Sequence, residues 1–135
     1  MRRAKIVLRA NPICQDLPKT DVPTGLNWEL WLGQAPLVDY MEGPNSQSSN
    51  KNFPASRGHY EFRWWYEYSG GKMTDWGAHH VDIAQWALGM DNSGPVSVES
   101  TGTMPVPYEK GFPTVNDKYN CARQFDVKCK FPNGT

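Results

Sequence analysis

The stretch from residue 73 to 88, "MTDWGAHHVDIAQWAL", constrains the fold most, because its apolar residues recur with the spacing of an amphipathic helix. A Ser-Gly-Gly turn at 69–71 precedes it, where Ser69 or Thr74 can cap the helix. Gly89 is suited to end it in the left-handed conformation. The sequence therefore predicts a helix over about 73–88. Its expected apolar face consists of Met73, Trp76, His80, Ala84, Ala87 and Leu88.

A polar ridge occupies another face of this helix. Asp75, His79 and Asp82 follow one another at helical spacing, and Trp86 falls on the same side. Three interpretations stay open. The ridge is an ordinary solvated surface, a divalent-metal site with oxygen and nitrogen ligands, or an acid–base site in which a carboxylate tunes an imidazole. The His-Glu-x-x-His pattern is absent, so we predict no metal.

The acid–base interpretation carries a further requirement. A His–carboxylate pair can take the proton of a substrate hydroxyl while a hydride leaves carbon, but the hydride then needs an acceptor. No side chain is a hydride acceptor, so a cofactor is implied. The chain has no Gly-x-Gly-x-x-Gly after a strand, and it therefore predicts no cofactor-binding residues of its own.

Composition narrows the class of protein. The 135 residues suit one domain, and 14 basic residues balance 14 acidic ones without clustering, which argues against nucleic-acid and anionic-membrane partners. No apolar run approaches the ~20 residues of a membrane span. Three widely spaced cysteines form neither a disulfide framework nor a zinc motif. A reducing compartment, the cytoplasm, is the default expectation, with export of the intact protein left open.

Aromatic residues are concentrated in two segments. Phe, Trp and Tyr make up 13% of the chain, and "NWELW" (27–31) and "FRWWYEY" (62–68) hold many of the tryptophans. Because Trp and Tyr join a large apolar face to a polar group, such clusters suit both core packing and sugar stacking.

The rest of the chain predicts strands and connections around this helix. We expect strands at 4–10, 95–100 and 121–131, with a loop at 102–113. We also expect a short helix at 26–33 that ends at Gly33. Leu26, Leu30 and Trp31 share one side of that helix, residues 41–59 form a flexible surface loop, and 60–68 is a strand or an extended entry to the main helix.

The last predicted strand alternates Phe125, Val127, Cys129 and Phe131 with polar residues, which indicates one buried face. The "PNGT" after it reads as a hairpin turn with no returning strand. The simplest interpretation is a piece of a longer protein cut within a sheet, with a frayed end as the alternative. An unpaired strand invites pairing with another chain, so we expect a homo-oligomer through the sheet. The predicted fold class is α+β: an open, mostly antiparallel sheet with the motif helix packed on it.

The ridge and its flanks resemble the C-terminal domain of the Gfo/Idh/MocA family (glucose–fructose oxidoreductase, inositol dehydrogenase, rhizopine catabolism). The matching motif is Gly70-Gly71, then Asp75, His79 and Asp82. The segments "GLNWELWLGQAPLVDY", "FRWWYEYSGGKMTDWGAHHVDIAQWALGMD" and "GPVSVE" resemble a tryptophan-rich bacterial branch, so the likeness covers most of the chain.

This resemblance implies one half of a two-domain oxidoreductase acting on a sugar, polyol or related hydroxy compound. A separate Rossmann domain, missing here, would bind NAD or NADP and supply a lysine, so this chain alone is expected to be inactive. His79 would be the general base, and Asp75 would orient it or bind the substrate hydroxyl. Further candidates for substrate contact or structural support are Asp82, Arg63, Trp64, Trp65 and His80.

Two points stay open within this resemblance. His80 turns toward the apolar face, so we expect a packed, hydrogen-bonded core histidine in preference to a ligand. The alternatives to the dehydrogenase half are a non-catalytic carbohydrate-binding or oligomerisation module and half of an NAD-assisted glycoside hydrolase.

Overall fold

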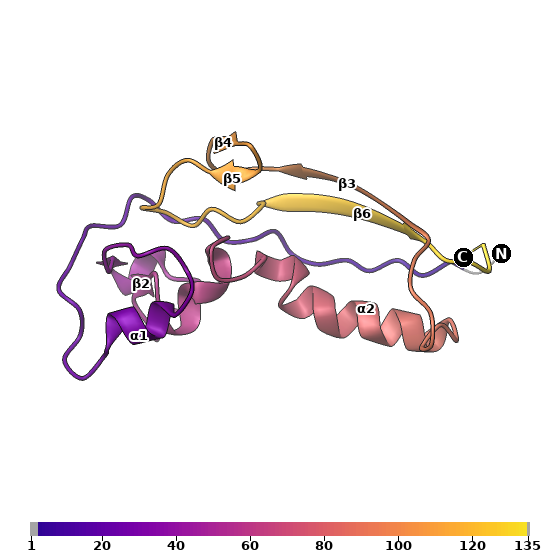
Figure 1. Ribbon diagram of the computed structural model, residues 1–135, viewed down its shortest axis with the longest axis horizontal. Helices are drawn as coiled ribbons and strands as arrows, with labels where there is room; N and C mark the ends of the chain where they lie inside the picture. Colours follow the sequence, from indigo (N-terminus) through magenta and orange to yellow (C-terminus); the bar gives the residue numbers. More distant parts are fainter. Residues whose placement is uncertain (1–2, 135) are drawn as a thin grey trace.

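The structure is a computed structural model that describes residues 3–134. The molecule is elongated, with a compact region at one end and an arm at the other (Figure 1). Its helices are α1 (Trp28–Leu32) and α2 (Trp76–Ala87), with 3-10 turns η1 (Asn45–Gln47), η2 (His59–Trp64) and η3 (Gly71–Met73). Its strands are β1 (Glu42–Gly43), β2 (Ala55–Ser56), β3 (Ser97–Thr103), β4 (Tyr108–Glu109), β5 (Phe112–Pro113) and β6 (Gln124–Lys130). Small open antiparallel sheets beside helices confirm the α+β class.

The arm contains α2 and the sheet formed by β3 and β6. The two strands pair antiparallel from Ser97 opposite Lys130 to Thr103 opposite Gln124, which confirms both predicted strands. β3 runs further than expected, and the predicted loop at 102–113 also contains the β4–β5 hairpin. Every residue of β3 is exposed, so this sheet is not a buried one. The predicted buried face of β6 is only partly formed, because Phe131 is buried, Phe125 and Val127 are half-buried and Cys129 is exposed.

Helix α2 confirms the main sequence prediction, but it begins after a 3-10 turn and its N-cap is Asp75. Thr74 does not cap it, because its Oγ1 accepts a hydrogen bond from the Gly70 amide at 2.8 Å. Gly89 has φ 69° just past the end, as predicted.

The inward face of α2 is displaced from the predicted apolar face. Gly77 is buried and Val81, Ala84 and Leu88 are half-buried, whereas Trp76 and Ala87 are exposed, contrary to the prediction. A Cβ atom at Gly77 would lie 3.7 Å from Leu8 Cδ1 and 2.9 Å from the Lys72 carbonyl oxygen. The helix therefore turns its glycine toward the N-terminal segment.

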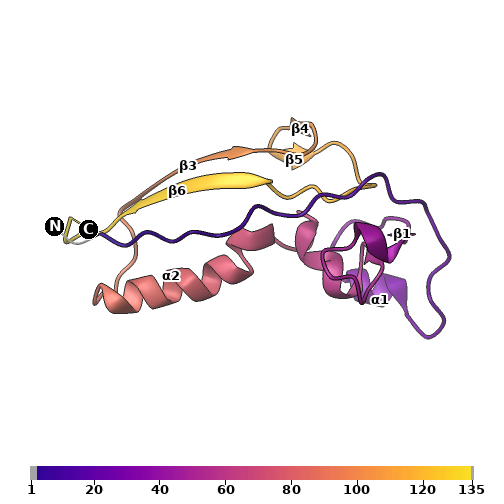
Figure 2. The same cartoon turned by 180° about the vertical axis from the view of Figure 1, so that it is seen from behind.

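The predicted strand at 4–10 is wrong. This segment runs without strand pairing, and Figure 2 shows it extending alongside α2 and β6. Just after it, the Asn11 amide donates to the Arg123 carbonyl at 2.9 Å, whereas β6 itself pairs with β3. The segment, α2 and β6 together line an apolar cavity of about 840 Å³. Helix and sheet thus face one another across this segment.

The compact region holds the core, in two clusters. One consists of Leu17, Ala55, Trp64, Trp65 and Tyr119, and the other of Trp28, Leu32 and Tyr40. Helix α1 confirms the predicted short helix, with Asn27 Oδ1 accepting from the Leu30 amide at 2.9 Å and Gly33 at φ 57°. Its predicted face is confirmed only in part, because Leu26 and Trp31 pack against the second cluster whereas Leu30 is 78% exposed. The buried residues of the helix are Trp28 and Leu32.

Residues 60–68 do not form the predicted strand or extended segment. Residues 59–64 form the 3-10 helix η2, so Trp64 and Trp65 are both buried and do not alternate. Residues 41–59 include β1, η1 and β2, and four of their side chains are buried. That segment therefore belongs partly to the core, and its flexibility stays a prediction. Within residues 3–134, no helix has both the length and the apolar character needed to cross a bilayer.

Candidate functional site: a polar ridge on α2

The predicted ridge lies on the solvent-facing side of α2. His79 and Asp82 are exposed, and Trp86 is 71% exposed two turns after His79. The Asp75 side chain keeps 22% of its surface in contact with solvent at the start of the helix. None of the ridge residues lines the apolar cavity, and His79 and Asp82 present their polar atoms to solvent.

Arg63 holds the carboxylate of Asp75. Its Nη1 lies 3.3 Å from Oδ1 and 3.4 Å from Oδ2, and both side chains are 22% exposed. Arg63 is itself fixed, because its Nε donates to the Tyr60 carbonyl at 3.1 Å and its guanidinium lies 4.3 Å from the Tyr60 ring centroid. No ion pair joins Asp75 to His79 in the part of the chain that the structure describes. Asp75 is thus positioned by η2.

The two histidines differ in their contacts. The His79 ring meets the Trp76 ring with centroids 5.6 Å apart and is otherwise exposed. His80 Nδ1 lies 2.9 Å from the Trp76 carbonyl oxygen, and the residue is half-buried. The predicted hydrogen bond of His80 is present, but its side chain lies at the edge of the helix and not in the core.

Trp64 and Trp65, two of the candidates for substrate contact or support, lie inside the compact region. They are 2% and 0% exposed. Trp64 Nε1 donates to Ser49 Oγ at 3.1 Å, and Trp65 Nε1 donates to the Ser56 carbonyl at 2.8 Å. Burial of both rings favours structural support, because neither presents a face to solvent.

Asn11 fixes the start of the helix relative to β6. Its Nδ2 donates to the Ala122 carbonyl at 2.5 Å, and its Oδ1 accepts from the Lys72 amide at 2.7 Å. Gly71 has φ 64°, and a Cβ there would lie 2.5 Å from Asn11 Nδ2. The second glycine of the motif is therefore required both by its backbone angle and by this contact. Nothing in the sequence near residue 11 signals this role.

A buried carboxylate, Glu61, was also missed by sequence reasoning. It is 0% exposed, and it accepts hydrogen bonds from Ser48 Oγ and Ser49 Oγ, each at 2.8 Å, and from the Tyr119 hydroxyl at 2.6 Å. Burial, and then the hydrogen bond to Glu61, raise the pKa of Tyr119 far above its usual range. These partners come from distant segments, so no local pattern reveals the network.

Arg57 forms a second buried polar group beside it. The side chain is 0% exposed, pairs with Glu67 Oε1 at 3.1 Å and stacks 4.1 Å from the Trp65 ring centroid. Asn120 Nδ2 completes the arrangement by donating to Glu67 Oε2 at 3.1 Å. These bonds compensate the charge of Arg57 inside the compact region.

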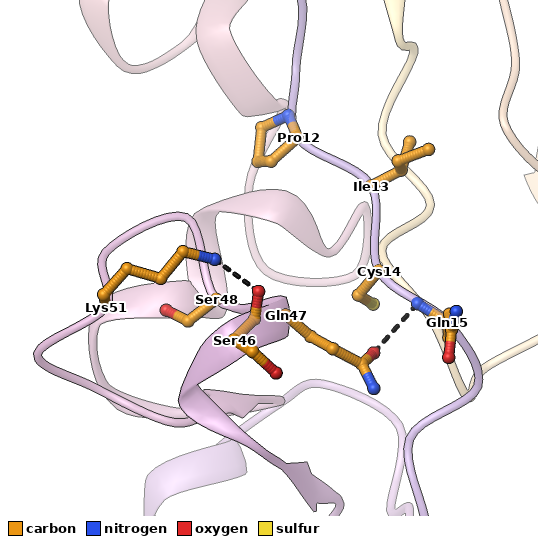
Figure 3. Close-up of a pocket in the computed structure, with 8 residues that line it drawn as sticks. All are labelled: Pro12, Ile13, Cys14, Gln15, Ser46, Gln47, Ser48 and Lys51. Carbon is orange, nitrogen blue, oxygen red and sulfur yellow. Dashed lines mark hydrogen bonds between the residues drawn. The ribbon is translucent and has the colours of Figure 1, made fainter.

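A polar pocket of about 500 Å³ opens in the compact region (Figure 3). The Gln15 amide donates to Gln47 Oε1 across it at 3.0 Å, and Lys51 Nζ donates to the Ser46 carbonyl. None of its lining residues belongs to the ridge. Residues 3–134 contain no group of three or more His, Cys, Asp or Glu side chains arranged to hold a metal.

Fold and ridge together define a class: α+β domains whose exposed helix displays a carboxylate and an imidazole one turn apart, after a double glycine. Residues 13–107 match the family described as "Oxidoreductase family, C-terminal alpha/beta domain", the Gfo/Idh/MocA type. The chain belongs to this family of oxidoreductase C-terminal domains. Neither curated proteins nor solved structures gave a match.

Proposed function

We propose that this domain is the substrate-binding and acid–base half of an NAD(P)-dependent oxidoreductase that acts on a sugar, a polyol or a related hydroxy compound. The observation that carries the proposal is the exposed ridge of α2, with Asp75 held by Arg63 and the His79 imidazole open to solvent one turn later. The family to which the chain belongs supplies the reaction class.

The cofactor does not fit the residues of this domain. A dinucleotide pyrophosphate needs a glycine-rich turn at a helix N-terminus, where amide groups and the helix dipole attract negative charge. The N-cap of α2 is Asp75, whose carboxylate would repel a phosphate, and the sequence lacks the glycine fingerprint. A nicotinamide held by another domain would supply the hydride acceptor.

The ridge residues would bind the substrate hydroxyls and accept the proton that is released. His79 would accept the hydroxyl proton of the substrate as general base. Asp75 would accept a hydrogen bond from a hydroxyl next to the reacting one, because the single proton of the reacting hydroxyl goes to His79. Its carboxylate is oriented by Arg63 and makes no ion pair with His79. Asp82, exposed one turn beyond His79, would accept a hydrogen bond from a neighbouring hydroxyl.

Turnover of matched variants tests the proposal. The chain is combined with a nucleotide-binding domain of its family and assayed with NAD or NADP over a panel of sugars and polyols. His79→Ala should lower turnover per folded molecule by roughly 10²–10⁴, the usual share of a general base. Asp75→Asn should lie between His79→Ala and the parent protein, and added chelator should change none of these rates.

His80→Ala is the matched control, since it removes the neighbouring imidazole, which lies about 100° further round the helix. It should leave the folded fraction largely active. An inactive His80→Ala beside a normal His79→Ala would overturn the assignment of roles. Sugar binding that persists in a chain for which no substrate and cofactor combination gives turnover would favour the carbohydrate-binding module instead.

A further inference from the structure

Trp76 is an aromatic side chain in contact with His79, the proposed general base. It directly follows Asp75 in sequence, and its ring centroid lies 5.6 Å from that of His79 and 5.7 Å from that of His80. Although both imidazoles touch the indole, 52% of the side chain remains exposed. Trp76 thus differs from the core tryptophans Trp64 and Trp65, which are 2% and 0% exposed.

We propose that the Trp76 indole is a stacking platform for the apolar face of a pyranose ring, and that it selects cyclic sugars over open-chain polyols. The inference rests on the proposed function for the location of the site and narrows its substrate class.

Pyranose rings and open-chain polyols differ in how well they can stack on an indole. A pyranose with equatorial hydroxyls presents C–H groups on both ring faces, which suit the electron-rich face of an indole, while its hydroxyls point outward. An open-chain polyol has no rigid apolar face and loses more rotational freedom when it binds. A ring stacked on Trp76 would turn its outward hydroxyls toward His79 and Asp75.

Trp86 is also exposed on α2, but within the described residues it does not contact an imidazole. It lies on the same helix and is more exposed, at 71%. Ten residues further along, it is displaced by about 15 Å from Trp76 along the helix axis. No aromatic contact joins it to an imidazole in residues 3–134. Trp86 therefore serves as the matched control for a solvent-exposed indole away from His79.

The test is a titration of the full chain, followed by nuclear magnetic resonance of the indole N–H groups. The probes are methyl β-glucopyranoside and the open-chain polyol glucitol, and Trp76→Phe assigns the Trp76 signal. The pyranoside should shift the Trp76 signal with a Kd of about 1–10 mM, as suits one open stacking contact. Glucitol should bind at least about tenfold more weakly. The Trp86 signal should not move.

Two variants complete the experiment. Trp76→Ala should abolish the pyranoside-induced shifts of the His79 ring, whereas Trp76→Phe should retain them in part and Trp86→Ala should retain them fully. No shift of the Trp76 signal, equal binding of glucitol, or an equal shift at Trp86 would each overturn the inference. Because the titration needs neither cofactor nor turnover, its failure is distinguishable from failure of the proposed reaction.

Discussion

The compact region and the α2 arm use the same kinds of side chain in opposite ways. In the compact region Glu61 and Arg57 are both fully buried. Glu61 accepts hydrogen bonds from several segments, and Arg57 donates hydrogen bonds to several. On α2, His79 and Asp82 are exposed. Tryptophans divide likewise, since Trp65 is 0% and Trp86 71% exposed.

This difference separates polar groups that specify the fold from polar groups available to a ligand. A charge taken out of water loses several kcal/mol of hydration, so it persists in a core only where the protein replaces those bonds. Glu61 and Arg57 meet that condition, and their hydrogen-bonding capacity is committed. A group that serves a ligand must keep its capacity open, as His79 does.

A pair of tryptophan variants should give the largest contrast. Trp65→Ala should lower the free energy of unfolding by about 3–5 kcal/mol, because it opens a cavity beneath Arg57 and leaves the Ser56 carbonyl without its donor. Trp86→Ala should change that free energy by no more than about 0.5 kcal/mol, because its ring is exposed. Denaturant unfolding of both variants measures the difference, and equal losses would contradict the division into two regions.

The pH dependence of stability gives a second contrast, between buried and exposed cysteines. Burial raises the pKa of Cys14 to about 11 and that of Cys121 to about 12, from an ordinary value of 9.0. The folded state therefore binds these protons more tightly, so the associated stability is complete below pH 9 and is lost as the pH rises through 11. The denaturant concentration at the unfolding midpoint should decrease as the pH is raised from 9 to 11, and this decrease should be smaller in Cys14→Ala.

Thiol labelling of the native protein is the control for that assignment. Cys129 is exposed and should react first with a disulfide reagent. Cys14 should react more slowly than an exposed thiol, since burial restricts access to its sulfur and raises its pKa to about 11. Equal labelling of all three thiols would show that the compact region opens readily.

Two carboxamide variants should give the smallest contrast. Glu61→Gln should lower the free energy of unfolding by about 1–2 kcal/mol, because charge-assisted bonds from Tyr119 and two serines become neutral ones. Asp82→Asn should leave it within about 0.5 kcal/mol, because that side chain is exposed. An unchanged stability of Glu61→Gln would mean that the buried carboxylate is dispensable to the fold.

The features that the sequence predicted well are those encoded by local spacing. Helix α2, the short helix α1 ending at Gly33 and the alternating strand β6 all follow from periodicity and glycine placement within one short window. The composition of the ridge follows for the same reason, because residues three and four apart share a helix face.

The features that the sequence did not predict depend on contacts between distant segments. Residues 60–68 fit period two in sequence, yet His59 adopts φ 47° and the chain turns into a 3-10 helix that buries both tryptophans. The partner of Asp75 is Arg63, twelve residues earlier and on another element. Glu61 and Tyr119 meet across 58 positions of sequence. Contacts of this range depend on how the elements pack, which spacing within one element does not encode.

The hydrogen bonds of the Asn11 side chain to Ala122 and Lys72 fix the chain just before α2, so a tilt of the helix would pivot about its first turn. Rise per residue places His79 about 6 Å and Trp86 about 16 Å beyond Asp75 along the axis. A tilt of about 10° at the pivot would thus displace Trp86 by nearly 3 Å but His79 by only about 1 Å. His79, the proposed general base, therefore lies where bending of the helix moves it least. Asn11 and Gly71 hold this end of the helix in place, although neither contacts a ligand in the proposed reaction.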